Sequence, residues 1–331
     1  MTVAYSQAVW TPEPLHRRSR KGGKLSLIIP MHNEGTALDL LFERLDAVLP
    51  RLSIDVELVC VDDGSTDETL DLLAVRAAAD PRVKVLALSR NFGKEAALTA
   101  GLEAATGTVL VPLDADLQDP PELMADFLAL WEQGYDVVYG VRTDRSSDTP
   151  FKRGAAAVFY RLFNAISHQS IPASTGDFRL MDRSVVEALK QLPERNRFMK
   201  GLFSWVGFRQ VGVPYARPAR SAGDTSWRTG SLIRLALDGL TAFSTAPLRV
   251  WTIIGGVSAV GALLYAAILI VRVLVVGRDV PGYASLMVAL LFAFAIQMMA
   301  FGVLGEYVGR LYEEVKGRPI YIVQKRIGFG A

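Results

Sequence analysis

The chain has 331 residues, of which 50% are hydrophobic and 21% are charged, and its 36 Lys and Arg residues nearly balance its 34 Asp and Glu residues. This composition excludes disorder over most of the chain, and a net charge of +2 gives no reason to expect a nucleic acid partner. Cys60 is the single cysteine, which excludes a disulfide framework and a thiolate zinc site. The low share of charge implies that apolar residues are concentrated in part of the chain.

The first part of the chain predicts an α/β domain. Residues 1–24 form a polar, basic tail without the apolar centre of a signal peptide. Helical patterns follow over 36–49 and 94–105. Ser65 or Thr66 is expected to cap the helix after the second strand. Asp119 is expected to cap a further helix that begins at Pro120 and Pro121. Between these lie the short apolar runs of the expected strands, at 25–30, 56–61, 83–88, 109–113 and 137–141. Such alternation predicts a mostly parallel sheet with helices on both faces.

Acidic side chains follow two of these strands directly. Asp62 and Asp63 end the second strand, while Asp114 and Asp116 follow the fourth. Ligands of open α/β sheets bind at the carboxyl ends of the strands, and clustered carboxylates repel one another unless a cation is present. A single acidic pair is better explained as a solvated turn or a helix cap. The four together favour a site for Mg²⁺ or Mn²⁺ and a nucleotide diphosphate.

Other site motifs are missing from the sequence. No G-x-G-x-x-G follows the first strand, and Gly93-Lys94 lacks the remaining residues of a P-loop. A calcium loop starting at Asp114 would need glycine where Asp119 stands. Neither H-E-x-x-H nor G-x-S-x-G occurs.

The end of the chain predicts a membrane hairpin. The ranges 251–271 and 281–305 carry no charge, and each exceeds the roughly 20 residues that span a bilayer; a pair of buried core helices is the alternative. Basic residues flank the pair on both outer sides, which places both termini in the cytoplasm and the short loop outside. Residues 229–250 are expected to form an amphipathic helix, lying in the membrane interface or packed on the domain. We expect the 306–331 tail to continue as a helix and fold back on the domain.

Several stretches resemble family 2 glycosyltransferases with the GT-A fold, and within them the bacterial polyprenyl-phosphate glycosyltransferases. The first are the turns at 30–34 and 62–65 and the Asp114-x-Asp116 motif. The more specific ones are SRNFGKEAAL (89–98), DADLQDPPEL (114–123), GDFRLMDR (176–183), VPGYASLM (280–287) and GEYVGRLYEEVKGRPIYIV (305–323). The resemblance is to bactoprenol glucosyltransferases and, more distantly, to dolichyl-phosphate mannose synthases. It implies a catalytic domain over 25–228 and an inverting transfer of a sugar from a nucleotide sugar, UDP-glucose first, to a polyprenyl phosphate.

The resemblance also implies roles for individual residues. Asp114, Asp116 and Gln118 would hold Mg²⁺ or Mn²⁺ with the diphosphate, and Asp116 and Asp177 would be the catalytic pair, Asp177 orienting the acceptor or acting as its base. The nucleotide sugar would be bound by Pro30, His32, Asn33, Glu34, Asp62, Asp63, Gly93, Lys94, Asp114 and Ala115. The lipid phosphate would be bound by Arg142, Arg145, Lys152, Arg197 and Arg220. Relatives usually carry Tyr in place of His32.

Some alternatives remain open. The donor is alternatively GDP-mannose or a UDP-4-amino-arabinose type of sugar. A processive polysaccharide synthase typically has more spans and a Q-x-x-R-W motif, which this sequence lacks. A membrane scaffold with an inactive transferase domain is the non-enzymatic alternative. The family resemblance also predicts a homo-oligomer in the bacterial inner membrane, serving cell-envelope glycosylation.

Overall fold

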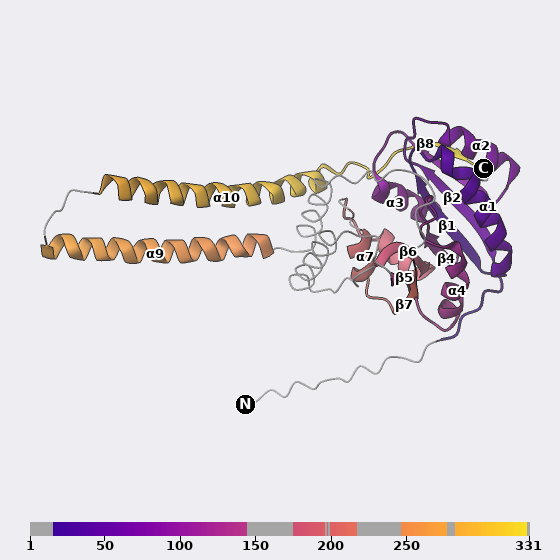
Figure 1. Ribbon diagram of the computed structural model, residues 1–331, viewed down its shortest axis with the longest axis horizontal. Helices are drawn as coiled ribbons and strands as arrows, with labels where there is room; N and C mark the ends of the chain where they lie inside the picture. The colour runs from indigo at the N-terminus through magenta and orange to yellow at the C-terminus, as the bar shows by residue number, and fades with distance from the viewer. Residues whose placement is uncertain are drawn as a thin grey trace, which may run out of the picture.

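The computed structural model describes residues 16–143, 175–195, 197, 199–216, 246–276 and 282–329. Its centre is an eight-stranded sheet in the order β7-β5-β6-β4-β1-β2-β3-β8, with β6 and β8 antiparallel to their neighbours and the other pairs parallel (Figure 1). The strands are β1 (Lys24–Met31), β2 (Asp55–Asp62), β3 (Val83–Leu88), β4 (Val109–Pro112), β5 (Val137–Arg142), β6 (Thr175–Asp182), β7 (Gln210–Tyr215) and β8 (Val323–Ile327). The predicted mostly parallel α/β sheet is confirmed.

Helices cover both faces of the sheet because the strands bury side chains on both sides. One face packs on α1 (Leu38–Val48), α2 (Thr69–Ala79) and α4 (Met124–Glu132) through Leu27 and Ile29 of β1. The other face packs on α3 (Lys94–Ala104), α6 (Arg183–Lys190) and α7 (Met199–Trp205) through Ile28. The alternation of Leu27, Ile28 and Ile29 between two cores is the period of a strand.

The helix caps differ from the prediction. Short 3-10 helices, η1 (Gly35–Ala37), η2 (Leu49–Leu52) and η3 (Pro121–Leu123), flank the longer helices. Pro121 begins η3 as expected, but Asp119 is no N-cap, because its carboxylate accepts a hydrogen bond from the Tyr215 hydroxyl. The predicted caps Ser65 and Thr66 are also wrong, since α2 begins at Thr69 after Glu68.

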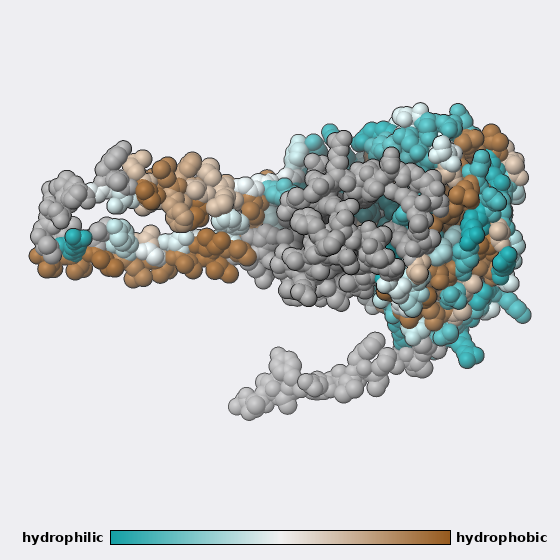
Figure 2. All heavy atoms as spheres, viewed as in Figure 1, coloured by the Kyte–Doolittle hydropathy of each residue, from teal (hydrophilic) through white to brown (hydrophobic). Residues whose placement is uncertain are grey.

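Two long apolar helices project from the domain as a hairpin. These are α9 (Ala246–Val276) and α10 (Tyr283–Lys316), which lie side by side (Figure 1). Over 250–268 and 285–316 they are long and apolar enough to cross a membrane. Their surface is mainly apolar, whereas the visible face of the domain mixes polar and apolar side chains (Figure 2). The predicted interfacial helix over 229–250 falls largely outside the described residues.

The tail after the hairpin returns to the sheet, as expected. Helix α10 ends at Lys316, where Gly317 adopts the left-handed conformation of a C-cap. Strand β8 then pairs antiparallel with β3, with Leu86 opposite Arg326. The hydroxyl of Tyr321 donates to Glu103 of α3, and the main-chain N–H of Arg195 donates to Glu314 at 2.9 Å. The hairpin is thus anchored to the domain at both the sheet and the loop after α6.

Candidate active site

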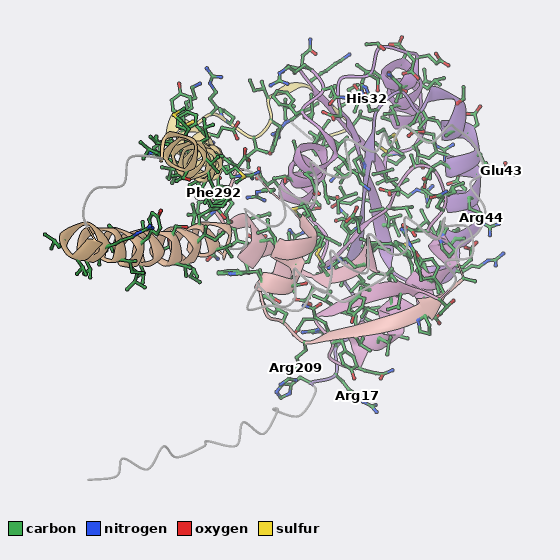
Figure 3. All side chains as sticks on the ribbon, turned by 60° about the vertical axis from the view of Figure 1, so that its left-hand side comes forward. Arg17, His32, Glu43, Arg44, Arg209 and Phe292 are labelled. Carbon is green, nitrogen blue, oxygen red and sulfur yellow. The ribbon has the colours of Figure 1, made fainter. Side chains whose placement is uncertain are left out.

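The carboxyl ends of β1 and β2 form two interlocked turns. Asn33, with φ of 57°, donates its N–H to Ser65 Oγ at 2.9 Å, and its side-chain oxygen accepts the N–H of Thr66 at 2.8 Å. His32 Nδ1 lies 3.0 Å from the main-chain oxygen of Asp63. Pro30 pairs in register with Val61, so the predicted nucleotide-binding residues of both turns lie together. Figure 3 shows His32 at this end of the sheet, with Glu43 and Arg44 away from it on α1.

Asp63 joins these turns to the loop before α3. Its two carboxylate oxygens accept the N–H groups of Phe92 at 2.7 Å and Gly93 at 2.8 Å, although the residue is buried. Gly64 allows this close approach, because a Cβ there would lie 2.4 Å from the carbonyl carbon of Arg90. Asp62 is also buried and accepts the N–H of Ser65 at 3.2 Å. The second strand end therefore organises backbone rather than presenting two free carboxylates.

The loop after β4 carries the predicted metal ligands. Ala115 is buried between Asp114 and Asp116, and the N–H of Gln118 donates to Asp116 Oδ1 at 3.1 Å. Leu117 has φ of +53°, a conformation that costs a non-glycine residue roughly 1–3 kcal/mol and clusters at functional sites. Among the described non-glycine residues, Asn33, Ser53 and Leu117 have positive φ, and Asn33 and Leu117 lie in loops that carry predicted site residues.

Lys94 lies between the carboxylates of Asp114 and Asp177. Its Nζ is 2.7 Å from Asp114 Oδ1 and 2.9 Å from Asp177 Oδ2. Desolvation disfavours the charged lysine, but the carboxylates of Asp177 and Asp114 outweigh it and raise its pKa above the ordinary value. The pKa of Asp114 is itself raised, first by desolvation, against the opposing effect of Lys94. No sequence pattern indicates this bridge, because it joins residues from three separate elements.

Arg142 lies beside this cluster. Its Nε donates to the Tyr215 hydroxyl at 3.3 Å, and its guanidinium is 3.8 Å from the buried carboxylate of Asp119. A Cβ on Gly176 would lie 2.9 Å from the same guanidinium. The Arg142 guanidinium therefore lies directly against Gly176, the residue that precedes Asp177 in the chain. Burial disfavours the charge on Arg142, but Tyr215 and Asp119 outweigh it and raise its pKa. Tyr215 was not predicted as part of this site, since nothing in its local sequence marks it.

The other predicted phosphate ligands are placed differently. Arg197 is buried in the loop between α6 and α7 and donates to the main-chain oxygens of Leu192 at 2.9 Å and Glu194 at 3.2 Å. Arg145, Lys152 and Arg220 lie outside the described residues. Of the predicted acceptor-phosphate ligands that the structure describes, Arg142 is the one beside the cluster of Lys94, Asp114 and Asp177.

The donor atoms of the Asp114 loop suit a hard divalent cation. No group of three or more His, Cys, Asp and Glu side chains arranged for a metal ion occurs among the described residues. Mg²⁺, however, is commonly bound by one or two carboxylates together with substrate phosphates, not by a cage of protein ligands alone. The carboxylates of Asp114 and Asp116 and the amide oxygen of Gln118 fit that type of site.

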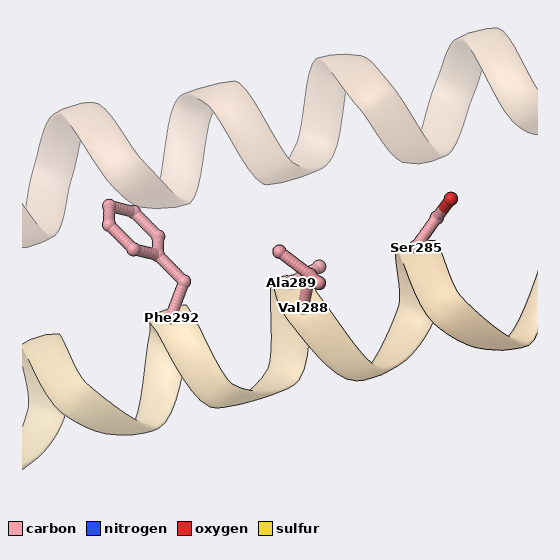
Figure 4. A pocket seen from close by; sticks show the side chains of 4 residues that line it. All are labelled: Ser285, Val288, Ala289 and Phe292. Atoms are coloured by element: carbon pink, nitrogen blue, oxygen red, sulfur yellow. The ribbon is translucent and has the colours of Figure 1, made fainter.

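A pocket of about 500 Å³ lies away from the sheet, in the hairpin. It is lined by Ser285, Val288, Ala289 and Phe292 of α10, and in Figure 4 Ser285 and Phe292 extend toward α9. Its lining is mainly apolar and carries no titratable group. The candidate site described above lies instead at the sheet edge.

Sequence comparisons identify the family. Residues 26–190 match the model described as glycosyl transferase family 2, and residues 246–311 match the GtrB C-terminal hairpin. A prophage bactoprenol glucosyl transferase homolog of Escherichia coli (strain K12) is 47% identical over 302 residues, covering 91% of this chain and 99% of that protein. An uncharacterized glycosyltransferase of Synechocystis sp. is 51% identical over 300 residues, covering 91% and 94%.

The chain is also similar to a solved structure of glucosyl-3-phosphoglycerate synthase from Mycobacterium tuberculosis, in complex with Mn²⁺, UDP and glucosyl-3-phosphoglycerate. The two are 20% identical with a TM-score of 0.46, and the match covers 67% of this chain and 79% of that one. The mostly parallel sheet with helices on both faces is the GT-A type of glycosyltransferase fold. The chain belongs to glycosyltransferase family 2 and is a glycosyltransferase.

Proposed function

We propose that the protein transfers a sugar, glucose from UDP-glucose, to a polyprenyl phosphate such as undecaprenyl phosphate at the cytoplasmic face of the inner membrane. The observation that carries the proposal is the 47% identity to a bactoprenol glucosyl transferase homolog, which extends over both the domain and the hairpin. One chain therefore combines a nucleotide-sugar domain with helices suited to a lipid acceptor.

The interlocked turns support a nucleotide site. Three kinds of group lie at the carboxyl ends of β1 and β2, where α/β sheets bind ligands. These are the ring of His32, the side-chain amide of Asn33 and the main chain of the loop before α3 that Asp63 holds. An imidazole stacks on a base as the more usual Tyr does, so His32 is compatible with either UDP or GDP. The donor assignment therefore follows the named relatives, and GDP-mannose is the alternative to test.

The Asp114 loop supports use of a divalent cation. Asp114, Asp116 and Gln118 would hold Mg²⁺ or Mn²⁺, which would act as a Lewis acid on the leaving diphosphate. The protein's own groups then position the two substrates. Lys94 and Arg142 supply positive charge beside the reacting centre, where phosphate groups of both substrates would meet.

The proposed reaction inverts the anomeric centre. An oxygen of the lipid phosphate attacks C1 of the glucose, the bond between C1 and the UDP oxygen breaks, and UDP leaves with the electron pair. The products are UDP and polyprenyl-phosphate glucose. Because the attacking phosphate is already an anion at neutral pH, Asp177 serves mainly to orient the acceptor, helped by Arg142 beside it.

The hairpin supports a multi-pass membrane location. With the basic flanks on the cytoplasmic side, the active site and both termini face the cytoplasm and the 277–282 loop faces outward. A homo-oligomer is part of the same proposal, and the mass of the detergent-solubilised particle tests it.

The decisive experiment measures transfer to lipid. Purified protein in detergent is mixed with undecaprenyl phosphate, Mn²⁺ and radiolabelled UDP-glucose, and label in the organic phase is counted with and without EDTA. We expect EDTA-sensitive label. No label from UDP-glucose but label from GDP-mannose would overturn the donor, and no label from any nucleotide sugar would overturn the proposed reaction.

Replacing a metal ligand tests the same site at one residue. Asp116→Ala removes a carboxylate from the Asp114 loop, and we expect transfer to fall at least about a hundredfold because the leaving diphosphate loses its counter-charge. Asp71→Asn, on the exposed side of α2, is the control and should leave transfer unchanged. Near-normal activity of a folded Asp116→Ala variant would contradict the metal assignment.

A further inference from the structure

Lys94 connects the two halves of the proposed active site. Its ammonium group contacts both oxygens of Asp114, at 2.7 Å and 2.8 Å, and one oxygen of Asp177, at 2.9 Å. Asp114 belongs to the proposed donor and metal side, and Asp177 to the proposed acceptor side. The ammonium group of Lys94 therefore neutralises two carboxylates, one on the proposed donor side and one on the proposed acceptor side.

The topology of the sheet brings these carboxylates together. Strands β4 and β6 are antiparallel neighbours, with Leu110 opposite Met181. Asp114 and Asp177 lie four residues further along that register, one on each chain segment. Helix α3 begins at Lys94, so its first side chain reaches the end of both segments. Two adjacent carboxylates repel each other, and the lysine removes that cost.

A divalent cation at Asp114 would compete with this lysine. Both Asp114 oxygens are engaged by the ammonium group, and a second positive charge a few ångströms away disfavours cation binding. The Lys94 side chain is 44% exposed, which leaves it room to move. When it leaves Asp114, Asp177 still offers it a partner within reach.

We propose that Lys94 is a positioning residue that exchanges partners: it holds Asp114 before the cation binds, and then pairs with Asp177 alone and orients that carboxylate toward the acceptor. This inference rests on the proposed function. If Lys94 exchanges partners in this way, binding of the cation at Asp114 and ordering of the Asp177 carboxylate occur together. The exchange is a change of ion pairs and breaks no covalent bond.

The test compares Mn²⁺ binding with transfer in the full-length protein. Free Mn²⁺ is measured by electron paramagnetic resonance while it is titrated into wild type and Lys94→Met in detergent, without nucleotide. Removing one charge at about 5 Å from a divalent ion in a water-like environment should tighten Mn²⁺ binding on the order of tenfold. At saturating Mn²⁺ the same variant should transfer sugar at least about tenfold more slowly, because Asp177 has lost its ion pair with Lys94.

Two further variants separate charge from structure. Lys94→Arg keeps the positive charge, so Mn²⁺ affinity should stay within about twofold of wild type and part of the transfer should return. Lys21→Met removes an exposed lysine before the start of β1, at the opposite end of the sheet, and should change neither quantity.

The outcomes are distinct. Tighter Mn²⁺ binding with slower transfer supports the exchange. If wild type binds Mn²⁺ and Lys94→Met binds it equally or more weakly, the exchange is wrong and Lys94 merely supports the fold, while the proposed function stands. If wild type binds no Mn²⁺ without nucleotide, the exchange is wrong, whereas the metal site proposed to form with the diphosphate is judged by the EDTA sensitivity of transfer.

Discussion

Asp63 illustrates how a carboxylate that resembles a ligand can organise the main chain. Both of its oxygens accept N–H groups from the loop before α3, and the residue is 3% exposed. Hydrogen bonds to an ionised group contribute roughly 1.5–3 kcal/mol each. The position of Gly93, and with it the start of α3 at Lys94, therefore depends on this one buried charge.

Asp63→Asn should disturb both stability and nucleotide binding. Asparagine keeps one acceptor oxygen and brings an N–H₂ group toward an N–H donor, so we expect a loss of about 1–3 kcal/mol in stability and about tenfold weaker UDP binding. Thermal unfolding and a UDP titration measure the two effects. Wild-type values for both would show that the loop is held by other contacts.

Glu57 is a second buried carboxylate, far from any predicted chemistry. Burial disfavours its charge, but hydrogen bonds from Lys24, Lys84, Ser26 and Thr106 outweigh that cost and hold its pKa far below the ordinary range. Its folded-state pKa is lower than its unfolded-state value of about 4.3. The stabilisation is therefore complete above that value and is lost as the pH falls below it.

Glu57→Gln should expose this pH dependence. At pH 7 the variant leaves Lys84 and the partly exposed Lys24 without this counter-charge, and we expect a loss of about 1–3 kcal/mol. The difference in melting temperature between wild type and variant should narrow between pH 5 and pH 3. A difference that stays constant over this range would mean that the charge on Glu57 contributes nothing.

At the scale of elements, β8 connects the apolar hairpin to the edge of the sheet where we propose that the nucleotide binds. The N–H of Ser89 donates to the oxygen of Ile322 at 2.9 Å, immediately after β3 and immediately before the loop that Asp63 holds. The aromatic ring of Phe329 packs under Lys84 and Arg326 and closes the end of this strand. The C-terminal segment is thus part of the catalytic fold.

Removing β8 should therefore affect more than the tail. A chain that ends at Gly317 leaves the β3 edge unpaired, and exposed edges promote aggregation. We expect a lower melting temperature, aggregation in size-exclusion chromatography and weaker UDP binding. A chain that ends at Phe329 keeps the strand and is the control; equal behaviour of the two would contradict a role for β8.

The strands differ in how readily the sequence predicted them. Strands β1 to β5 are mostly apolar, because most of their side chains are buried on both faces, and all were expected within a residue or two. Strands β6, β7 and β8 were not expected. β6 carries Asp177, Arg179 and Asp182, and β8 is an edge strand with exposed Lys325, so neither has an apolar run.

The candidate site was predicted as a set of residues and not as a geometry. Sequence motifs marked Asp114, Asp116 and Asp177, since acidic groups follow strands or match a family motif. The bridge through Lys94 depends on the register of β4 with β6, and the contacts of Arg142 depend on Tyr215 of β7. These contacts depend on the pairing of segments that are distant in the sequence, so no local sequence pattern predicts them.

For the whole molecule, the buried thiol of Cys60 makes the membrane orientation testable. Burial raises the pKa of this thiol to about 12, so it forms almost no thiolate and gives no labelling background. We expect a membrane-impermeant maleimide to label Gly282→Cys in intact spheroplasts and Lys316→Cys only after permeabilisation. The reverse pattern would invert the proposed orientation, and the unsubstituted protein should stay unlabelled throughout.

The return of β8 to the sheet also has a consequence for how the protein is made. The edge of β3 is synthesised early, whereas its partner strand β8 is synthesised only after both hairpin helices. At the usual pace of translation this edge waits roughly ten seconds or more. Completion of the sheet therefore follows synthesis of the hairpin, so a nascent chain that stalls before the bilayer segment is finished has an incomplete catalytic domain.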